Sequence, residues 1–256
     1  MSRQAQAALL FLIGGAMVHT ATTGLYLRYV KAGLQPLLLA AGAVLIATAA
    51  ATAWYELRRP ATTGRQRHTE ETHEGQQESD GHRDGDRHRE PRVSWLLVLP
   101  LFALILAAPP ALGSYDAMRT GTALQPPLAY PALPPGDPLK LTLVDYAERA
   151  AYGHGRTLGD RKVEITGFVA LDRGGTPYLV RMALNCCAAD AQPVKIGLSG
   201  ELPPVLRPDS WLQVTGTYTG KRTKDPVGGG IIPFIDVVDA KPVPAPEDPY
   251  DESWNQ

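Results

Sequence analysis

Cysteine is nearly absent from this chain, whose 256 residues contain only two, the adjacent Cys186 and Cys187. A network of ordinary disulfides is therefore excluded, because each bridge needs its own suitably separated pair. The sequence also lacks a P-loop, an HExxH zinc motif, a dinucleotide-binding glycine fingerprint and a recognisable Ser-His-Asp set. Hydrolytic and nucleotide-driven chemistry is disfavoured, and we expect a protein that is not an enzyme.

An excess of positive charge is also missing. The formal net charge is −1, and acidic residues outnumber basic ones in residues 113–256. A protein that binds nucleic acid needs a basic surface to neutralise phosphates. The charge balance therefore predicts no nucleic-acid partner.

Charged side chains are absent from two long apolar runs, residues 7–27 and 34–55. About 20 apolar residues in a helix cross a hydrocarbon core. The first run could instead be a secretory signal peptide, but it is longer than a usual signal core and a second run follows at once. We expect two transmembrane helices within residues 1–55. His19 lies in the first of them and is an intramembrane functional candidate, or a neutral histidine bonded to a neighbouring helix.

Residues 56–93 are rich in arginine, acids and histidine and nearly devoid of apolar residues, which predicts a disordered charged linker. A third apolar run, residues 94–112, is interrupted by Pro100 and is interpreted as a third transmembrane helix, with an interfacial or re-entrant segment as the alternative. The arginines of the linker place it in the cytoplasm by the positive-inside rule. With three spans, everything after residue 113 is extracytoplasmic in a multi-pass protein of the cell membrane.

The remaining chain predicts a small all-β domain. Residues 113–138 are proline-rich and are interpreted as an extended spacer, and residues 139–151 as a short helix that Thr142 could cap. Alternating or apolar runs predict five short strands at residues 163–171, 178–184, 194–198, 211–218 and 232–238. We expect an OB-like five-stranded β-barrel over residues 139–242, with a β-sandwich fragment as the alternative, and a disordered tail over residues 243–256.

The two cysteines are the main candidates for chemistry. Thiolates are ligands for Zn²⁺ or Cu(I), and adjacent cysteines can also form a strained vicinal disulfide. Both could equally be small buried residues at the end of a strand. Asp190 and His154 are candidate third ligands, and Arg181 could favour the thiolate form.

The residues around the cysteines resemble those of a bacterial family of permease subunits whose C-terminal region is a domain of unknown function. The resemblance is carried by the Arg-x-x-x-x-Cys-Cys-x-Ala-Asp-Ala core, which spans residues 181–191 here, and by Pro109, Pro110, Leu112 and Gly113. It implies a few N-terminal helices, a charged loop and a terminal domain. It also implies a separate polytopic permease as partner.

These observations support three functions. The first is an accessory membrane subunit of a permease, involved in transport, whose outer β-domain gates or captures a solute. The second is an extracytoplasmic thiol protein that cycles between dithiol and vicinal disulfide or binds a soft metal ion. The third is a structural anchor. Three spans are too few for a usual solute pathway, which favours an accessory role.

Overall fold

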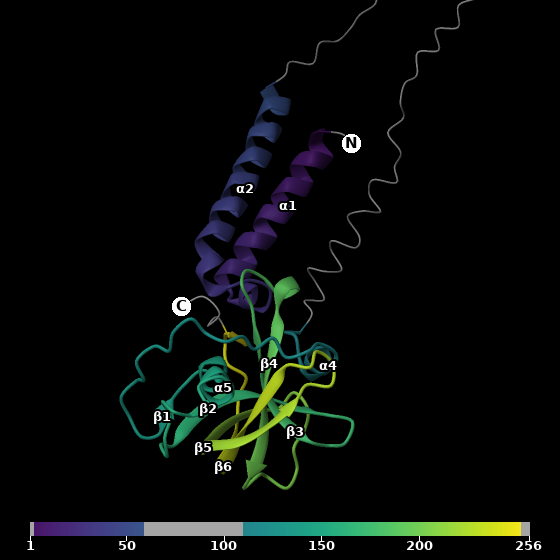
Figure 1. Cartoon of the computed structure of the whole chain (residues 1–256). Helices are drawn as coiled ribbons and strands as arrows, with labels where there is room; N and C mark the ends of the chain where they lie inside the picture. Colours follow the sequence, from purple (N-terminus) through teal and green to yellow (C-terminus); the bar gives the residue numbers. More distant parts are fainter. Residues whose placement is uncertain (1–2, 59–109, 252–256) are drawn as a thin grey trace, which may run out of the picture. The chain divides into compact units, whose positions relative to one another are not determined.

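The computed structural model of this chain describes residues 3–58 and 110–251 (Figure 1). Within that part the chain divides into two compact units. Among the described residues, the first unit contains residues 3–18 and 39–58. The second contains His19–Leu38 and residues 110–251. The predicted linker, except for residues 56–58, which are helical, and most of the third apolar run lie outside the described residues.

Two helices in the N-terminal half, α1 (Arg3–Thr22) and α2 (Gln35–Arg58), are long and apolar enough to cross a membrane. Gly14 and Gly42 face each other closely. A Cβ at Gly14 would lie 2.8 Å from the carbonyl oxygen of Gly42 and 2.9 Å from Ile46. Packing through small residues is typical of helix pairs in membranes.

The first helix ends five residues earlier than the sequence predicts. The hydroxyls of Thr22 and Thr23 donate to the carbonyl oxygen of His19, and Gly24 adopts a left-handed conformation with φ 76°. Hydroxyl bonds of this kind compete with helix continuation, and glycine adopts positive φ without steric cost. Two short 3₁₀ turns, η1 (Leu25–Arg28) and η2 (Ala32–Leu34), then lead into α2. We refer to residues 24–34 as the hairpin loop.

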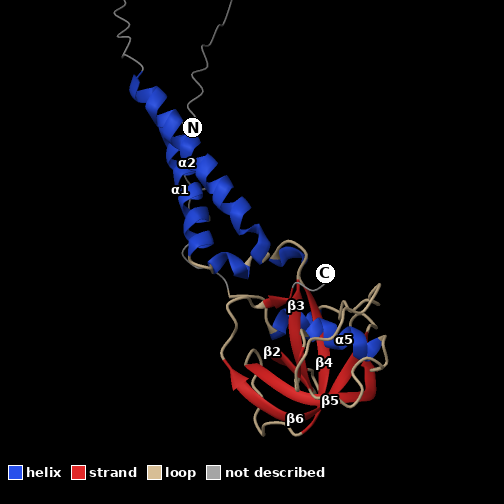
Figure 2. Cartoon of the chain, turned by 90° about the vertical axis from the view of Figure 1, so that its left-hand side faces the viewer, coloured by secondary structure: helices blue, strands red, loops and turns tan. Residues whose placement is uncertain are grey.

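The C-terminal region contains a closed five-stranded β-barrel, as the sequence predicts (Figure 2). Its strands are β2 (Val163–Leu171), β3 (Pro177–Ala183), β4 (Gln192–Gly200), β5 (Trp211–Lys224) and β6 (Ile231–Val243). The strand order is β2-β5-β6-β4-β3, and a β2–β3 pairing closes the ring. Every neighbouring pair in the ring is antiparallel except β4 and β6, which are parallel.

The helix α5 (Leu143–Ala151) closes one end of the barrel and contacts all five strands. Thr142 caps it as predicted, because its hydroxyl accepts a hydrogen bond from the Asp145 N–H at 3.1 Å. Gly167 in β2 allows this packing, since a Cβ there would lie 3.0 Å from the Leu143 side chain. The helix is shorter than predicted because Leu139–Lys140 instead forms strand β1, parallel to β2.

The interpretation of residues 113–138 as an extended spacer is wrong in part. Ser114–Arg119 form helix α4, which packs on the outer surface of β2 and β3. Ala117 is fully buried there in a second apolar cluster, beside Phe168 and Val180. The barrel therefore buries apolar residues on both sides of these strands, inside the ring and beneath α4.

The C-terminal part of the barrel is more extended than predicted. Strand β5 continues past its predicted end at residue 218 to Lys224, where it pairs with Ile231, and β6 extends past residue 238 to Val243. The prediction of a disordered tail over residues 243–256 is also wrong in part. Tyr250–Asp251 form strand β7, parallel to the end of β3, and Tyr250 is only 3% exposed. Buried Tyr250 belongs to the outer cluster with Ala117.

The predicted third transmembrane helix, residues 94–112, lies outside the described residues except for its last three. Residues 110–112 are described and are not helical. They lead directly into α4, so the barrel unit begins at this point in the chain.

Candidate functional site

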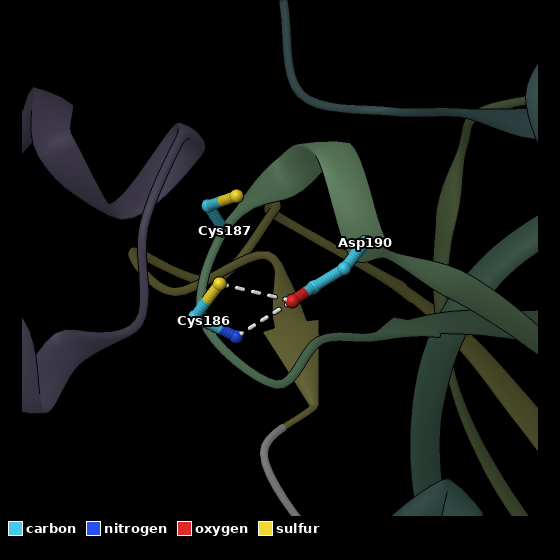
Figure 3. A group of neighbouring side chains, drawn as sticks. All are labelled: Cys186, Cys187 and Asp190. Carbon is cyan, nitrogen blue, oxygen red and sulfur yellow. Dashed lines mark hydrogen bonds between the residues drawn. The ribbon is translucent and has the colours of Figure 1, made fainter.

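The two cysteines lie in the connection between β3 and β4, residues 184–191, which we call the cysteine loop (Figure 3). Buried Leu184 anchors its start, and a single 3₁₀ turn, η4 (Ala188–Asp190), forms its second half. The turn brings the Asp190 carboxylate back over the start of the loop. There it accepts the main-chain N–H of Asn185 at 3.1 Å and that of Cys186 at 3.0 Å. Short aspartate side chains stabilise turns in this way.

The turn gathers three groups that can bind a metal ion. The sulfur atoms of Cys186 and Cys187 and a carboxylate oxygen of Asp190 all lie within 4.8 Å of one another. The Cys186 thiol donates to Oδ2 of Asp190 at 3.1 Å, as the dashed line in Figure 3 marks. Cys186 is exposed and Cys187 and Asp190 are half-buried, and neither cysteine is in a disulfide. The group is therefore assembled and open to solvent.

The charges of this group follow from its hydrogen bonds. Partial burial alone would raise the pKa of Asp190, but hydrogen bonds from Cys186 and from main-chain N–H groups outweigh it, so the pKa lies below its usual value. The same hydrogen bond to Asp190, with a smaller contribution from Cys187, raises the pKa of the Cys186 thiol to about 11. Without a metal, Cys186 is thus a neutral thiol beside a carboxylate. A bound cation would replace the thiol proton, as metal ions do at cysteine sites.

The other predicted ligands lie elsewhere. His154 is exposed in the turn after α5, with φ 50°, and is not a member of the group around Cys186. Arg181 donates to the carbonyl oxygen of Tyr250 at 2.6 Å, and its guanidinium lies 5.1 Å from the centre of the Trp211 ring. It is committed to the C-terminal segment and the barrel surface. His19 is exposed in the last turn of α1.

The cysteine loop also bonds to the hairpin loop, a contact that the sequence did not predict. The Lys31 N–H donates to the carbonyl oxygen of Cys186 at 3.1 Å, and the Ala188 N–H donates to that of Tyr29 at 2.7 Å. Val30 and Cys187 form an antiparallel bridge between them. Figure 3 shows the hairpin loop, in purple, beside the two cysteines. We call this short β-like contact the seam.

A second charged group, inside the barrel unit, was also missed. The Lys195 ammonium of β4 donates to Oδ2 of Asp225 at 2.7 Å and to the carbonyl oxygen of Thr120 at 2.8 Å. The two charged side chains are at most 1% exposed. The available signal was a lysine in the middle of the apolar run at residues 193–198. Its acid, Asp225, is 30 residues away, and nothing in the local pattern links them.

Comparison with protein families identifies residues 141–251 as a DUF1980 C-terminal domain. Comparisons with curated proteins and with solved structures find no significant match. The family match agrees with the predicted C-terminal domain of unknown function and covers the barrel, α5 and the cysteine loop. The chain therefore contains a DUF1980 C-terminal domain, and Cys186, Cys187 and Asp190 lie within it.

Proposed function

We propose that this protein is a membrane-anchored metal-binding protein whose barrel captures a thiophilic divalent cation of the Zn²⁺ type. The observation that carries the proposal is the gathering of two sulfur atoms and one carboxylate oxygen within 4.8 Å on an exposed loop. The solute that the sequence led us to expect for the β-domain is, in this proposal, the metal ion itself. The domain binds and releases its cargo and catalyses no reaction.

The ligand atoms fit a tetrahedral ion without rebuilding the loop. Zn–S bonds of about 2.3 Å and Zn–O bonds of about 2.0–2.2 Å place tetrahedral ligand atoms about 3.5–3.8 Å apart. The sulfur of Cys186 is 3.1 Å from the carboxylate, and no pair in the group exceeds 4.8 Å. Small side-chain rotations therefore suffice. Three protein ligands leave a fourth position for water or for a ligand from a partner, which suits capture and release.

The ligand chemistry favours Zn²⁺ over Cu(I). Copper(I) is best served by soft sulfur ligands alone, whereas Zn²⁺ accepts thiolate and carboxylate together. Asp190 is ionised and its other hydrogen bonds orient it toward Cys186. Hydrogen bonds that orient a ligating side chain commonly raise metal affinity. The carboxylate is therefore the residue that selects the divalent ion.

The barrel is best classified as OB-like. Numbered within the barrel, its strands run 1-2-3-5-4 around the ring, and the only parallel pair joins the third and fifth strands. This arrangement supports a five-stranded Greek-key barrel of the OB type. A β-sandwich fragment would leave two separate sheets, whereas the β2–β3 and β4–β6 pairings here close one ring.

The chain enters and leaves the barrel unit in a way that supports three membrane crossings. The hairpin loop emerges between the two apolar helices and is hydrogen-bonded to the barrel, so the barrel lies on the side of the membrane where this loop emerges. The chain then leaves α2 at Arg58 on the opposite side and rejoins the barrel unit at residue 110. A return crossing is needed, and the apolar run at residues 94–112 supplies it. The arginines that follow α2 in the sequence support a cytoplasmic linker and hence a barrel outside the cytoplasm.

This topology predicts opposite labelling of two cysteines. The native Cys186 should react with a membrane-impermeant maleimide on intact cells. In a variant with both native cysteines replaced by alanine, Gly75→Cys should react only after lysis. Labelling of the residue-75 cysteine on intact cells would contradict the proposed topology.

The partner expected from the sequence resemblance is a polytopic permease. The open coordination position supports this, because a captured ion has to be passed to a second set of ligands. Purification of the full-length protein with its membrane neighbours would test the partnership. Recovery of a multi-span transport protein in stoichiometric amount supports it, and recovery of this chain alone contradicts it.

The metal-binding proposal is tested by zinc titration of the reduced full-length protein in detergent, in competition with a chromophoric chelator. We expect one Zn²⁺ per chain, and none in the Cys186→Ser/Cys187→Ser variant. His154→Ala is the matched control and should bind as the wild type does. Failure of the wild type to compete for zinc or copper, or equal binding by the double variant, would overturn the proposal. A pair that oxidises to a vicinal disulfide and takes up no metal would instead support the thiol redox function.

A further inference from the structure

The seam and the candidate metal site share two residues, Cys186 and Cys187, and the third residue of the seam, Ala188, directly follows them. Cys186 supplies one sulfur ligand and accepts the Lys31 N–H with its own carbonyl oxygen. Cys187 supplies the second sulfur and forms the bridge with Val30. Ala188, the next residue, donates to Tyr29. Restraint of either cysteine side chain therefore acts on a residue whose main chain belongs to the seam.

The hairpin loop has a second attachment that does not involve the cysteines. The Tyr250 hydroxyl donates to the carbonyl oxygen of Arg28 at 3.0 Å and accepts the Leu112 N–H at 3.3 Å. Tyr250 is fixed in turn by its pairing with β3 and by Arg181. Loss of the seam alone would therefore leave the hairpin loop attached to the barrel through Tyr250. The seam can loosen or tighten while this second attachment stays in place.

An ion in the site would restrain the seam. Two thiolates and a carboxylate bound to one ion fix the side chains at positions 186, 187 and 190 and so restrict the main chain between them. Ordering of a segment by one ligand lowers the entropy cost of its second contact, which couples the two. Because coupling is reciprocal, weakening the seam must weaken metal binding by the same factor.

We propose that occupation of the Cys186–Cys187–Asp190 site tightens the seam and thereby passes the state of the site to the loop that joins the two apolar helices. This inference rests on the proposed metal-binding function and adds a regulatory output to it. The output is a firmer attachment of the hairpin loop to the barrel when the ion is bound. The helices α1 and α2 begin or end at that loop and are the elements that would respond.

The seam can be weakened without touching a ligand. Lys31 has φ −57° and ψ 141°, a conformation that proline adopts readily, and Val30 before it forms a β-bridge, which suits the residue before a proline. Lys31→Pro therefore removes the N–H that donates to Cys186 and little else of the main chain. Lys31→Ala removes the same side chain, keeps the N–H and serves as the matched control.

The test is the zinc affinity of these variants in the full-length protein, measured by chelator competition. Lys31→Pro should bind zinc about 5- to 150-fold more weakly than wild type, the usual range of coupling between sites. Lys31→Ala should stay within about twofold of wild type, well below that range. Equal affinity of Lys31→Pro and Lys31→Ala would overturn the coupling while leaving metal binding intact. Absence of zinc binding by the wild type would overturn both proposals.

Hydrogen exchange of the wild-type protein tests the coupling in the other direction and does not depend on the folding of a variant. Zinc should slow exchange of the Lys31 and Ala188 amides. It should leave the Ala123 amide unchanged, because its acceptor is the carbonyl oxygen of Pro193 in β4. Identical exchange at Lys31 and Ala188 with and without bound zinc would overturn the inference.

Discussion

Asp190 and Asp225 are two carboxylates that accept main-chain hydrogen bonds in different surroundings. Each accepts two main-chain N–H groups, from Asn185 and Cys186 for Asp190 and from the nearby Val227 and the distant Thr122 for Asp225. Asp225 is buried and receives the ammonium of Lys195, a cation supplied by the chain itself. Asp190 is half-exposed and receives the thiol of Cys186, and the described residues place no lysine or arginine in an ion pair with it.

This difference separates a structural ion pair from the proposed binding site. A buried carboxylate is tolerated when a cation and further hydrogen bonds satisfy it, and Asp225 has both. Asp190 is oriented just as firmly, yet its neighbours are two sulfur atoms that a cation could bind. The Asp225 cluster thus already contains its cation, whereas the Asp190 group is the one that we propose takes a cation from outside.

The largest expected effect comes from removing the internal cation. Lys195→Met leaves the buried Asp225 carboxylate without its charged partner and should lower the free energy of unfolding by about 3–5 kcal/mol. Lys140→Met is the matched control, because Lys140 pairs with Glu164 at 3.6 Å and is 79% exposed, and it should cost less than about 1 kcal/mol. Denaturant unfolding of the full-length protein in detergent measures both. Similar losses in the two variants would mean that the Lys195 pair is not a structural cluster.

The same substitution at the two carboxylates sharpens the comparison. Asp225→Asn leaves the Lys195 ammonium buried without a charged acceptor and should cost about 1.5–3 kcal/mol. Asp190→Asn keeps an oxygen for only one of the two main-chain N–H groups, but the position is half-exposed and water can serve the other, so it should cost about 1 kcal/mol or less. Denaturant unfolding of the two variants measures both changes in stability. A larger loss for Asp190→Asn would reverse the roles assigned to the two groups.

Zinc affinity should show the opposite order. Asp190→Asn replaces an anionic ligand by a neutral one, and we expect zinc binding at least about tenfold weaker. Asp225 lies outside the group around Cys186, so Asp225→Asn should leave the zinc affinity of the folded protein unchanged. Chelator competition at one temperature measures both. An unaltered affinity in Asp190→Asn would remove the carboxylate from the site.

The smallest effect concerns pH. Burial alone would raise the pKa of Asp225, but hydrogen bonds from Lys195, Val227 and Thr122 outweigh it and hold the pKa below the usual value. A carboxylate with a lowered folded pKa contributes stability that is present above its unfolded pKa, about 3.9, and is lost as pH falls through its folded pKa. The difference in unfolding free energy between wild type and Asp225→Asn should therefore be constant near neutral pH and shrink below about pH 4. A difference that persists unchanged at lower pH would contradict this assignment.

Much of the barrel could be predicted because its signals are local. Alternation places Val163, Ile165 and Val169 on the inner face of β2, where all three are buried. Thr142 caps α5, and Asp172 accepts the N–H groups of the following turn, as short polar side chains at such positions do. Cys186, Cys187 and Asp190 lie within five residues of one another in the sequence, so they could be predicted as candidate ligands as well.

The missed features depend on contacts between distant segments. The proline-rich composition around α4 gave no sign that Ala117 would be buried on β2 and β3. Tyr250 looked like part of a polar tail, but its position is set by pairing with β3 and by a bond to Arg28, 222 residues away. The seam likewise joins residues 29–31 to residues 186–188, which are far apart in the sequence, so no local pattern indicates it. His154 was chosen because it is the only histidine after residue 90 of the sequence, and the fold places it outside the group around Cys186.

Zinc K-edge X-ray absorption on the zinc-loaded, reduced full-length protein tests the central claim most directly. Two sulfur scatterers at about 2.3 Å and oxygen at about 2.0–2.2 Å are predicted for the wild type, and any zinc that the Cys186→Ser/Cys187→Ser variant retains nonspecifically should show no sulfur scatterer. A zinc environment of nitrogen and oxygen alone, identical in wild type and variant, would contradict the claim that these cysteines and Asp190 form a metal site.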